Sequence, residues 1–533
     1  MKKRIAILMA AAMAMSVSTG VFAEEAEKVL TVGWPYEAST LDPARASDDA
    51  SYRMVNLLVE PLLRNISNEA VAGAAERYEA NEDNTEYTFY LREDNMFSDG
   101  TKITANDFAY SIQRVLDPEK ANENANGLYV IKNGAAFNMG ECEASELGIE
   151  VVDDYTLKLT LEYPAYPLDF TSREYSPVSQ ALSESADIAY GAEAENLLGN
   201  GPYVLTEWTH DSEMILEKND NYWNADAVNL DKIVVKVNAS GDTAVDMMLA
   251  GELDVADMGS MMQVDTLTAS GFSSAINNAG VECLHINHAG LSDEAGLFLS
   301  NANFRKALNY ALDRNALIMA AYTTDIPTTR LIGASEAGVE ATFQEEYAYE
   351  GWTTAADAEK AQECLNLALE ELGKTVEEIP TFSMLCFDSE TNMIALNAVM
   401  DLWDKTLGVK CQIDAQPIQN MLQKMYTGEF DFWKGAITAS GVDSIGYGEY
   451  FVSDGGLFGY NNAEFDALYK DAKYATSWEA RKDAIFAMET KLCEEAVDLF
   501  IAWPCTYYVY DSAIEGVTVN KDAIDFTFAD IAE

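Results

Sequence analysis

The chain has 533 residues, with 34 lysines and arginines against 89 aspartates and glutamates, and its formal charge is −55. Nucleic-acid binding requires cations that neutralise phosphates, so this excess of acids excludes it as the main activity. Hydrophobic residues make up 48% of the chain, far more than in a disordered acidic protein. Because a single core stops growing at roughly 250–300 residues, we expect two or three packing units.

Residues 1–23 have the layout of a secretory signal peptide. A basic head at residues 2–4 precedes an apolar stretch, and small residues precede Glu24. The stretch is too short for a stable membrane-spanning helix, although an uncleaved anchor is the alternative. The first cysteine is Cys142, so no lipid-anchor cysteine stands at the cleavage point after Ala23. We therefore expect an exported protein, periplasmic or otherwise extracytoplasmic, that is soluble after cleavage.

The cysteines and histidines do not form a recognisable metal-binding motif. Seven cysteines in an exported chain leave at least one thiol unpaired, and their spacing shows no short metal-binding pairs. His285 and His288 would share a metal only on a helix, but they follow an alternating pattern that is typical of a strand end. We predict polar histidines at the edge of a cleft, with metal ligation as the alternative. No metal and no cofactor are expected.

The first half of the chain begins with alternating strand and helix patterns. Residues 29–32 and 86–91 are predicted strands, and the apolar residues of segment 55–62 form a helical face. Thr104 is a predicted helix N-cap, because Asp107 follows three residues later.

The second half continues this pattern. Residues 361–372 and 396–407 carry apolar residues at helical spacing, and they end at Gly373 and Gly408. Residues 409–413 then alternate as a strand. Runs of this kind predict α/β units with largely parallel sheets, joined by short crossings because no long linker is present.

Enzyme motifs are absent from the sequence. The chain lacks the G-x-S-x-G, H-E-x-x-H and G-x-x-x-x-G-K-[ST] patterns of nucleophilic, zinc-dependent and phosphate-binding sites. Its many acids are best interpreted as a solvated surface that keeps an exported protein soluble. We therefore predict a protein that is not an enzyme.

A family resemblance appears at residues 97–111. Their sequence, F-S-D-G-T-K-I-T-A-N-D-F-A-Y-S, resembles the signature F/W-S-D-G-x-x-x-T-A-x-D-F-x-Y-S of the extracytoplasmic solute-binding proteins of ABC importers. The class is the one that binds oligopeptides, dipeptides or nickel (solute-binding protein family 5). Further segments that resemble the family pattern are 39–43, 113–118, 199–208, 221–223, 251–254, 304–314 and 460–466. Together they span nearly all of the mature chain.

The resemblance implies an α/β clamshell of the type II-like periplasmic-binding-protein kind, with an extra small domain inserted in the first lobe. Lobe I would comprise residues 24–62, 191–270 and 501–533, the inserted domain 63–190, and lobe II 271–500. The chain would cross between lobes near residues 269–270 and 503–504. A solute would lie between the lobes and favour the closed form, without covalent chemistry. We expect a monomer that meets an ABC permease in the membrane.

In peptide-binding members of the family, the ligand is held as an added strand between two edges. The segments that align with those edges are 46–49 and 435–440. The candidate ligand-binding residues are Ser47, Asp48, Asp49, His285, Lys434, Ala436, Ile437, Thr438, Ser440 and Asp443.

Two departures from the family pattern bear on the ligand. Ile437 stands at the place of a tryptophan, and Ser440 stands at the place of the aspartate that pairs with the ligand ammonium. A neutral serine lacks the charge-assisted bond, worth about 1.5–3 kcal/mol. Asp443 would substitute if the loop is remodelled, and Lys434 aligns with an arginine that receives a ligand carboxylate in some relatives. Alternatively, Lys434 and Asp443 are solvated residues of an exposed loop.

The preferred hypothesis is therefore a peptide-binding component of an ABC importer. A non-peptide solute, such as an oligosaccharide, an opine-like conjugate or a metal chelate, is the alternative for the same clamshell. A secreted hydrolase or a structural surface protein is the third hypothesis, and the absence of nucleophile motifs argues against it.

Overall fold

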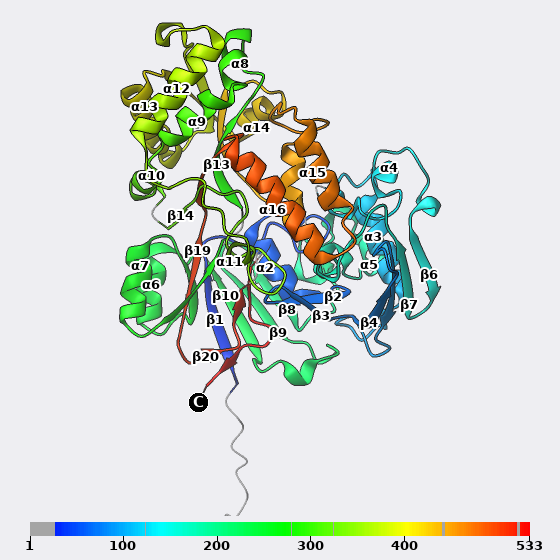
Figure 1. Ribbon diagram of the computed structural model, residues 1–533. Coiled ribbons are helices and arrows are strands. Elements are labelled where there is room, and N and C mark those ends of the chain that lie inside the picture. Colours follow the sequence, from blue (N-terminus) through cyan, green and yellow to red (C-terminus); the bar gives the residue numbers. More distant parts are fainter. Residues whose placement is uncertain are drawn as a thin grey trace, which may run out of the picture.

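The computed structural model describes residues 27–122, 124–278, 280–322, 324–439, 443–519 and 523–532. The predicted signal peptide and Ser440 lie outside these residues. The chain forms a two-lobed α/β clamshell, and a smaller domain lies beside it (Figure 1).

The lobe I sheet has seven strands in the order β12-β19-β11-β1-β10-β9-β8. The central strand β1 pairs in parallel with β10 and β11, and the other neighbours are antiparallel. The strands are β1 (Val29–Trp34), β8 (Tyr203–Thr209), β9 (Glu213–Lys218), β10 (Lys232–Val237), β11 (Val255–Met258), β12 (Ser273–Asn277) and β19 (Thr506–Tyr510).

The lobe II sheet has six strands in the order β14-β18-β13-β17-β15-β16. Only β15 forms parallel pairs, with β16 and β17. The prediction of largely parallel sheets is therefore wrong for both lobes. In lobe I, β8 and β9 are joined by a short turn and pair antiparallel, and in lobe II β13 pairs antiparallel with both β17 and β18, which come much later in the chain. The strands are β13 (Val281–Ile286), β14 (Ile326–Pro327), β15 (Phe382–Phe387), β16 (Cys411–Gln416), β17 (Phe432–Ile437) and β18 (Leu499–Trp503).

The inserted domain has its own four-stranded sheet in the order β4-β5-β7-β6. Helix α3 (Ala105–Leu116) packs in the same domain, and the Thr104 backbone N–H donates to the Asp107 carboxylate at 2.8 Å. The predicted N-cap is therefore confirmed. The strands of this domain are β2 (Leu63–Ile66), β3 (Glu69–Ala72), β4 (Ala75–Ala80), β5 (Glu86–Leu91), β6 (Ile149–Asp153) and β7 (Thr156–Thr160).

Two of the predicted helices end as the sequence indicates. Helix α12 (Ala358–Leu372) ends at Gly373, and α13 (Glu390–Leu407) ends at Gly408. Both glycines have positive φ angles, 63° and 72°, which residues with a Cβ adopt at a cost. The other helices are α2 (Asp49–Leu58), α4 (Gly134–Asn138), α5 (Gln180–Ala186), α6 (Gly241–Leu249), α7 (Met261–Ala269), α8 (Asp293–Leu299), α9 (Ala302–Tyr310), α10 (Arg314–Ala321), α11 (Phe343–Glu346), α14 (Ile418–Tyr426), α15 (Ala463–Lys473) and α16 (Trp478–Glu494).

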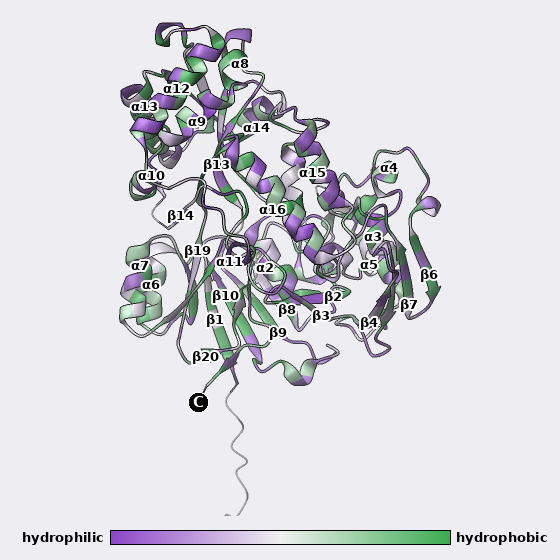
Figure 2. Cartoon of the chain, viewed as in Figure 1, coloured by the Kyte–Doolittle hydropathy of each residue, from purple (hydrophilic) through white to green (hydrophobic). Residues whose placement is uncertain are grey.

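Each unit has its own apolar core. Leu30 and Val32 are buried in lobe I, Phe89 and Phe108 in the inserted domain, and Trp403 in lobe II. Figure 2 shows hydrophobic residues along the lobe I strands and mixed faces on outer helices such as α12. In the part of the chain that the structure describes, every helix is too short or too polar to cross a membrane.

The two crossings between the lobes lie next to each other. Strand β12 belongs to the lobe I sheet up to Asn277, so the first crossing comes later than residues 269–270. The second crossing joins β18 to β19. Asn277 pairs with Thr506, and beyond the crossings Glu282 pairs with Ala502, so the crossing segments form one narrow junction.

Candidate ligand-binding site

A cluster of charges lies on lobe I beside this junction. Arg53 of α2 is only 2% exposed, and its guanidinium bonds the Asp257 carboxylate at 2.8 Å and pairs with Asp49. It lies against the rings of Trp34 and Tyr508, at 5.3 and 5.1 Å. Burial raises the pKa of Asp257 to about 6, against the opposing effect of Arg53. On the lobe I side, the junction therefore lies beside the Asp257 carboxylate, which is protonated at a higher pH than an ordinary aspartate.

The predicted residues on lobe I surround the start of α2. Asp48 is the N-cap of that helix and accepts hydrogen bonds from the Ser51 backbone N–H at 2.9 Å and the Ser51 hydroxyl at 2.6 Å. Although burial opposes it, hydrogen bonds from Ser39 and Ser51 lower the pKa of Asp48. Ser47 is exposed and Asp49 is partly exposed. The hydrogen bonds that the Asp48 carboxylate accepts are thus those of the helix N-cap. The predicted residues of this segment that remain accessible to a ligand are Ser47 and Asp49.

A matching cluster lies on lobe II. Lys434 of β17 is only 4% exposed, forms an ion pair with Glu282 of β13, and lies 5.1 Å from the ring of Tyr322. Burial opposes the charge of Lys434, but Glu282 raises its pKa above the ordinary value. Burial also raises the pKa of the neighbouring Asp325 to about 6. Lys434 is therefore not the solvated loop residue of the alternative interpretation, and its charge is already paired.

Strand β17 has an open edge after Lys434. It pairs with β13 along its whole length, but with β15 only from Phe432 to Lys434. Gly435 to Ile437 therefore have no strand partner on the β15 side among the described residues. Ala436 and Thr438 are exposed, whereas the Ile437 side chain is 3% exposed. This segment has the geometry needed to accept an added strand.

His285 lies inside lobe II, away from any cleft edge. Its Nδ1 is 2.5 Å from the Asp498 carboxylate, and its ring is stacked between Trp433 and Phe458, at 4.6 and 4.5 Å. The prediction that His285 contacts the ligand is therefore corrected, because the side chain is fully buried. His288 is also buried, which lowers its pKa to about 3.

One residue cluster has the composition of a metal site. Cys283, His285 and Asp498 offer ligand atoms that lie within 4.8 Å of one another. However, Asp498 already accepts hydrogen bonds from the backbone N–H of Ile286 at 2.8 Å and interacts with His285. These contacts are those of a buried structural pair.

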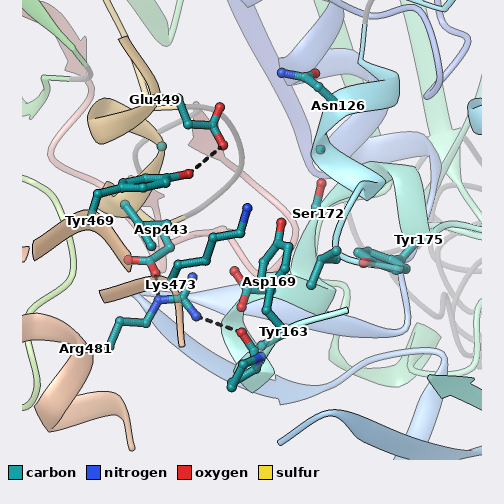
Figure 3. Close-up of a pocket in the computed structure, with 16 residues that line it drawn as sticks. Asn126, Tyr163, Asp169, Ser172, Tyr175, Asp443, Glu449, Tyr469, Lys473 and Arg481 are labelled. Atoms are coloured by element: carbon teal, nitrogen blue, oxygen red, sulfur yellow. Dashed lines mark hydrogen bonds and ion pairs between the residues drawn. The ribbon is translucent and has the colours of Figure 1, made fainter. Parts of the chain in front are cut away.

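Asp443 lies in a pocket between the inserted domain and lobe II (Figure 3). Its carboxylate is 2.8 Å from the Lys482 ammonium and 2.6 Å from the Arg481 guanidinium, and it is 3% exposed. The Asp443 carboxylate, which was predicted to substitute for Ser440, therefore forms ion pairs with two cations of the protein itself. The pocket has a volume of about 650 Å³ including its open mouth. Its lining comes from the inserted domain and from lobe II: Asn126, Gly127, Val130, Tyr163, Pro164, Ala165, Asp169, Ser172, Tyr175, Asp443, Ile445, Gly446, Glu449, Tyr469, Lys473 and Arg481.

Asp49 and Lys434 were predicted as site residues, but their partners Arg53, Asp257 and Glu282 were not. Asp257 comes three residues after the 251–254 segment, and Glu282 lies on the same strand as His285. No spacing rule connects Arg53 to Asp257 or Glu282 to Lys434, because each pair joins segments more than 150 positions apart.

The comparisons with known proteins agree with this architecture. The family model for bacterial extracellular solute-binding proteins, family 5, matches residues 69–458. The chain therefore belongs to this family of solute-binding proteins.

Two curated relatives from Bacillus subtilis (strain 168) match over most of their length. The oligopeptide-binding protein OppA is 27% identical over 500 residues, covering 92% of this chain and 90% of the relative. The dipeptide-binding protein DppE is 27% identical over 511 residues, covering 95% and 92%. The crystal structure of the substrate-binding domain of an oligopeptide ABC transporter from Bacillus anthracis has a TM-score of 0.75 at 26% identity, covering 95% of this chain and 99% of that one.

Proposed function

We propose that this protein captures a peptide between its two lobes and delivers it to an ABC permease. The observation that carries the proposal is the open edge of β17 from Gly435 to Ile437, which lies beside the interlobe junction. An extended peptide bonds such an edge through its backbone, largely independently of its sequence. The names of the relatives OppA and DppE support a peptide ligand. We further propose that the mature protein is exported and acts as a monomer.

The charges beside the junction favour a cationic peptide. Asp49 and Asp257 on lobe I face one arginine, and Glu282 and Asp325 on lobe II face one lysine. Each cluster therefore carries one more acid than base when all groups are ionised. A ligand ammonium or guanidinium compensates this excess, whereas a ligand carboxylate adds to it.

The test uses the full mature chain, unfolded and refolded to remove any co-purified ligand. Titration calorimetry compares trilysine, trialanine and triglutamate, with maltotriose and a nickel–histidine chelate as non-peptide probes. We expect trilysine to bind most tightly and triglutamate most weakly. Binding of maltotriose or the chelate in the absence of peptide binding would overturn the proposal in favour of a non-peptide solute.

A methylated form of trilysine tests directly whether the peptide binds as an added strand. Trilysine that is methylated on the backbone nitrogen of its second lysine keeps its charges but loses one backbone N–H donor. Since one net hydrogen bond contributes about 0.5–1.5 kcal/mol, we expect its Kd to be about threefold to tenfold higher. Equal affinities would show that the peptide is not held as an added strand.

A further inference from the structure

A second groove lies between the inserted domain and lobe II, apart from the proposed peptide site. Residues 67–70 at the β2–β3 turn, Tyr78 and residues 166–168 line one wall, and residues 337–345 with Trp478 line the other. The groove has a volume of about 1250 Å³ including its open mouth. In Figure 1 it lies where the first turn of α16 approaches β2 and β3. Its described lining includes none of the residues proposed to hold the peptide.

The groove contains aromatic side chains from both walls. The Tyr166 ring lies 5.1 Å from the Trp478 ring. The Tyr166 hydroxyl donates to the Ala475 carbonyl at 2.9 Å, and the Trp478 indole N–H donates to the Gly338 carbonyl at 2.8 Å. Because their polar groups already have partners, the two rings offer mainly apolar surface to a ligand, to which residues 167–168 add a proline and a leucine.

Tyr78 offers a further ring surface. The rings of Trp478 and Tyr166 already lie near protein cations, Lys482 at 4.0 Å and Arg481 at 5.1 Å. In the part of the chain that the structure describes, no lysine or arginine lies over the Tyr78 ring, and this residue is 37% exposed. The negative face of a tyrosine ring attracts an organic cation. Tyr78 can therefore receive a cation from outside the protein.

The charged residues of the groove all have the same sign. They are three exposed glutamates, Glu69 from the inserted domain and Glu340 and Glu345 from lobe II. The described lining contains no lysine or arginine, whereas the pocket in Figure 3 contains Lys473 and Arg481 beside its acids. The uncompensated glutamates attract a cation and repel an anion.

We infer that this groove is a second binding site, which takes an organic cation with an apolar body. The apolar body packs against Tyr78, Tyr166 and Trp478, and the ammonium or guanidinium group lies near the glutamates. The three rings supply apolar contact area, and the charges select the sign of the ligand. Binding here requires no peptide between the lobes, so the site goes beyond the proposed function.

The test compares three probes that share an indole body and differ in charge. Tryptamine is a cation, tryptophol is neutral and indole-3-propionate is an anion. Titration calorimetry on the refolded, full mature chain measures the three Kd values at low ionic strength, where exposed charges are least screened. We expect tryptamine to bind most tightly and indole-3-propionate most weakly. Absence of tryptamine binding, or equal affinities for the three probes, would overturn the inference.

Two variants test the groove itself. Glu69→Gln/Glu340→Gln removes one charge from each wall, and we expect the Kd of tryptamine to rise about threefold to tenfold while that of tryptophol changes little. Tyr78→Leu keeps an apolar side chain but removes the ring, and we expect a rise of about twofold to fivefold for tryptamine. The charge preference of the wild type decides the matter even if one variant does not fold.

Two further double variants serve as controls. Glu359→Gln/Glu370→Gln removes the same charge from exposed positions of α12, and Asp257→Asn/Asp325→Asn removes two acids of the charged clusters beside the interlobe junction. Both controls should bind tryptamine as the wild type does. If the Asp257→Asn/Asp325→Asn variant loses tryptamine binding and the groove variants keep it, the probe binds between the lobes and the inference is wrong.

Discussion

Asp42 and Arg114 form a buried, bidentate ion pair that joins two segments of the family pattern, 39–43 in lobe I and 113–118 in the inserted domain. Asp42 is 0% and Arg114 is 6% exposed. Asp42 also accepts the Ala44 backbone N–H at 3.1 Å, which fixes the turn after the motif. The Asp42 carboxylate therefore stabilises the turn that follows residues 39–43 and also binds the inserted domain to lobe I through Arg114.

Asp42→Asn is predicted to destabilise the protein strongly. Removing one partner of a buried pair leaves an uncompensated charge, here Arg114, at a cost of about 3–5 kcal/mol in the free energy of unfolding. Urea denaturation measures this difference. The control is Glu79→Gln, which removes an ion pair with Arg77 on an exposed strand, where solvent screens the charges. An Asp42→Asn variant as stable as the control would contradict the structural role.

Binding of cationic peptides is predicted to weaken as the pH falls through about 6. Asp257 and Asp325 each have a pKa raised to about 6, so both lose their charge between pH 7.5 and pH 5. We expect the Kd of trilysine to rise over this range, while that of trialanine changes much less. The double variant Asp257→Asn/Asp325→Asn should bind trilysine weakly at both pH values. A trilysine Kd that is independent of pH would contradict the proposed role of the two carboxylates.

The raised pKa of Asp257 is predicted to weaken peptide binding at low pH but to stabilise the fold there. The pKa of Asp257 rises from 3.8 in the unfolded chain to about 6 in the fold, so the folded protein holds this proton more tightly. Its contribution to stability is therefore greatest below pH 4 and is lost as the pH rises through 6. Comparing the pH dependence of Tm for the wild type and Asp257→Asn isolates this contribution.

Lys434→Ala is predicted to affect stability more than recognition of a ligand carboxylate. The Lys434 ammonium already pairs with Glu282, and its loss leaves that partly buried acid near Asp325. We expect a loss of about 2–4 kcal/mol in the free energy of unfolding. Amidating the carboxyl end of trialanine should change the Kd by the same factor in the variant and the wild type. A much larger factor in the wild type would show that Lys434 binds the ligand carboxylate.

Gly199→Ala is predicted to be severely destabilising. A Cβ at this position would lie 1.9 Å from the Leu58 carbonyl oxygen, so the backbone at the end of α2 must move. Gly127→Ala is the control, because no atom lies within 4 Å of its added Cβ. We expect the Gly199 variant to lose about 3–5 kcal/mol or fail to fold, as judged by circular dichroism and urea denaturation. Equal stability of the two variants would contradict the close packing.

The sequence patterns predicted local structure well. Strand β5 and the capped start of α3 follow from alternation and from the Thr104–Asp107 spacing. The ends of α12 and α13 follow from glycine. Each of these signals depends on residues a few positions apart, and local sterics and hydrogen bonding are sufficient to produce them.

The candidate site was only partly predictable. The sequence indicated the edge at Ala436 and Thr438, because this edge lies in a continuous segment that resembles the family pattern. It did not predict that His285 is enclosed by Trp433 and Phe458, or that Asp443 is held by two cations. These outcomes depend on which distant segments pack together.

By itself, the amino-acid sequence determined the family, the positions of many elements and the acidic character of the protein. Only the tertiary structure decided the antiparallel majority of its sheets, the pairing of Arg53 with Asp257 and of Lys434 with Glu282, and the contact between the inserted domain and lobe II. The physical reason is that strand order and buried ion pairs join residues hundreds of positions apart. Their partners are selected by packing and desolvation, which short-range sequence patterns do not encode.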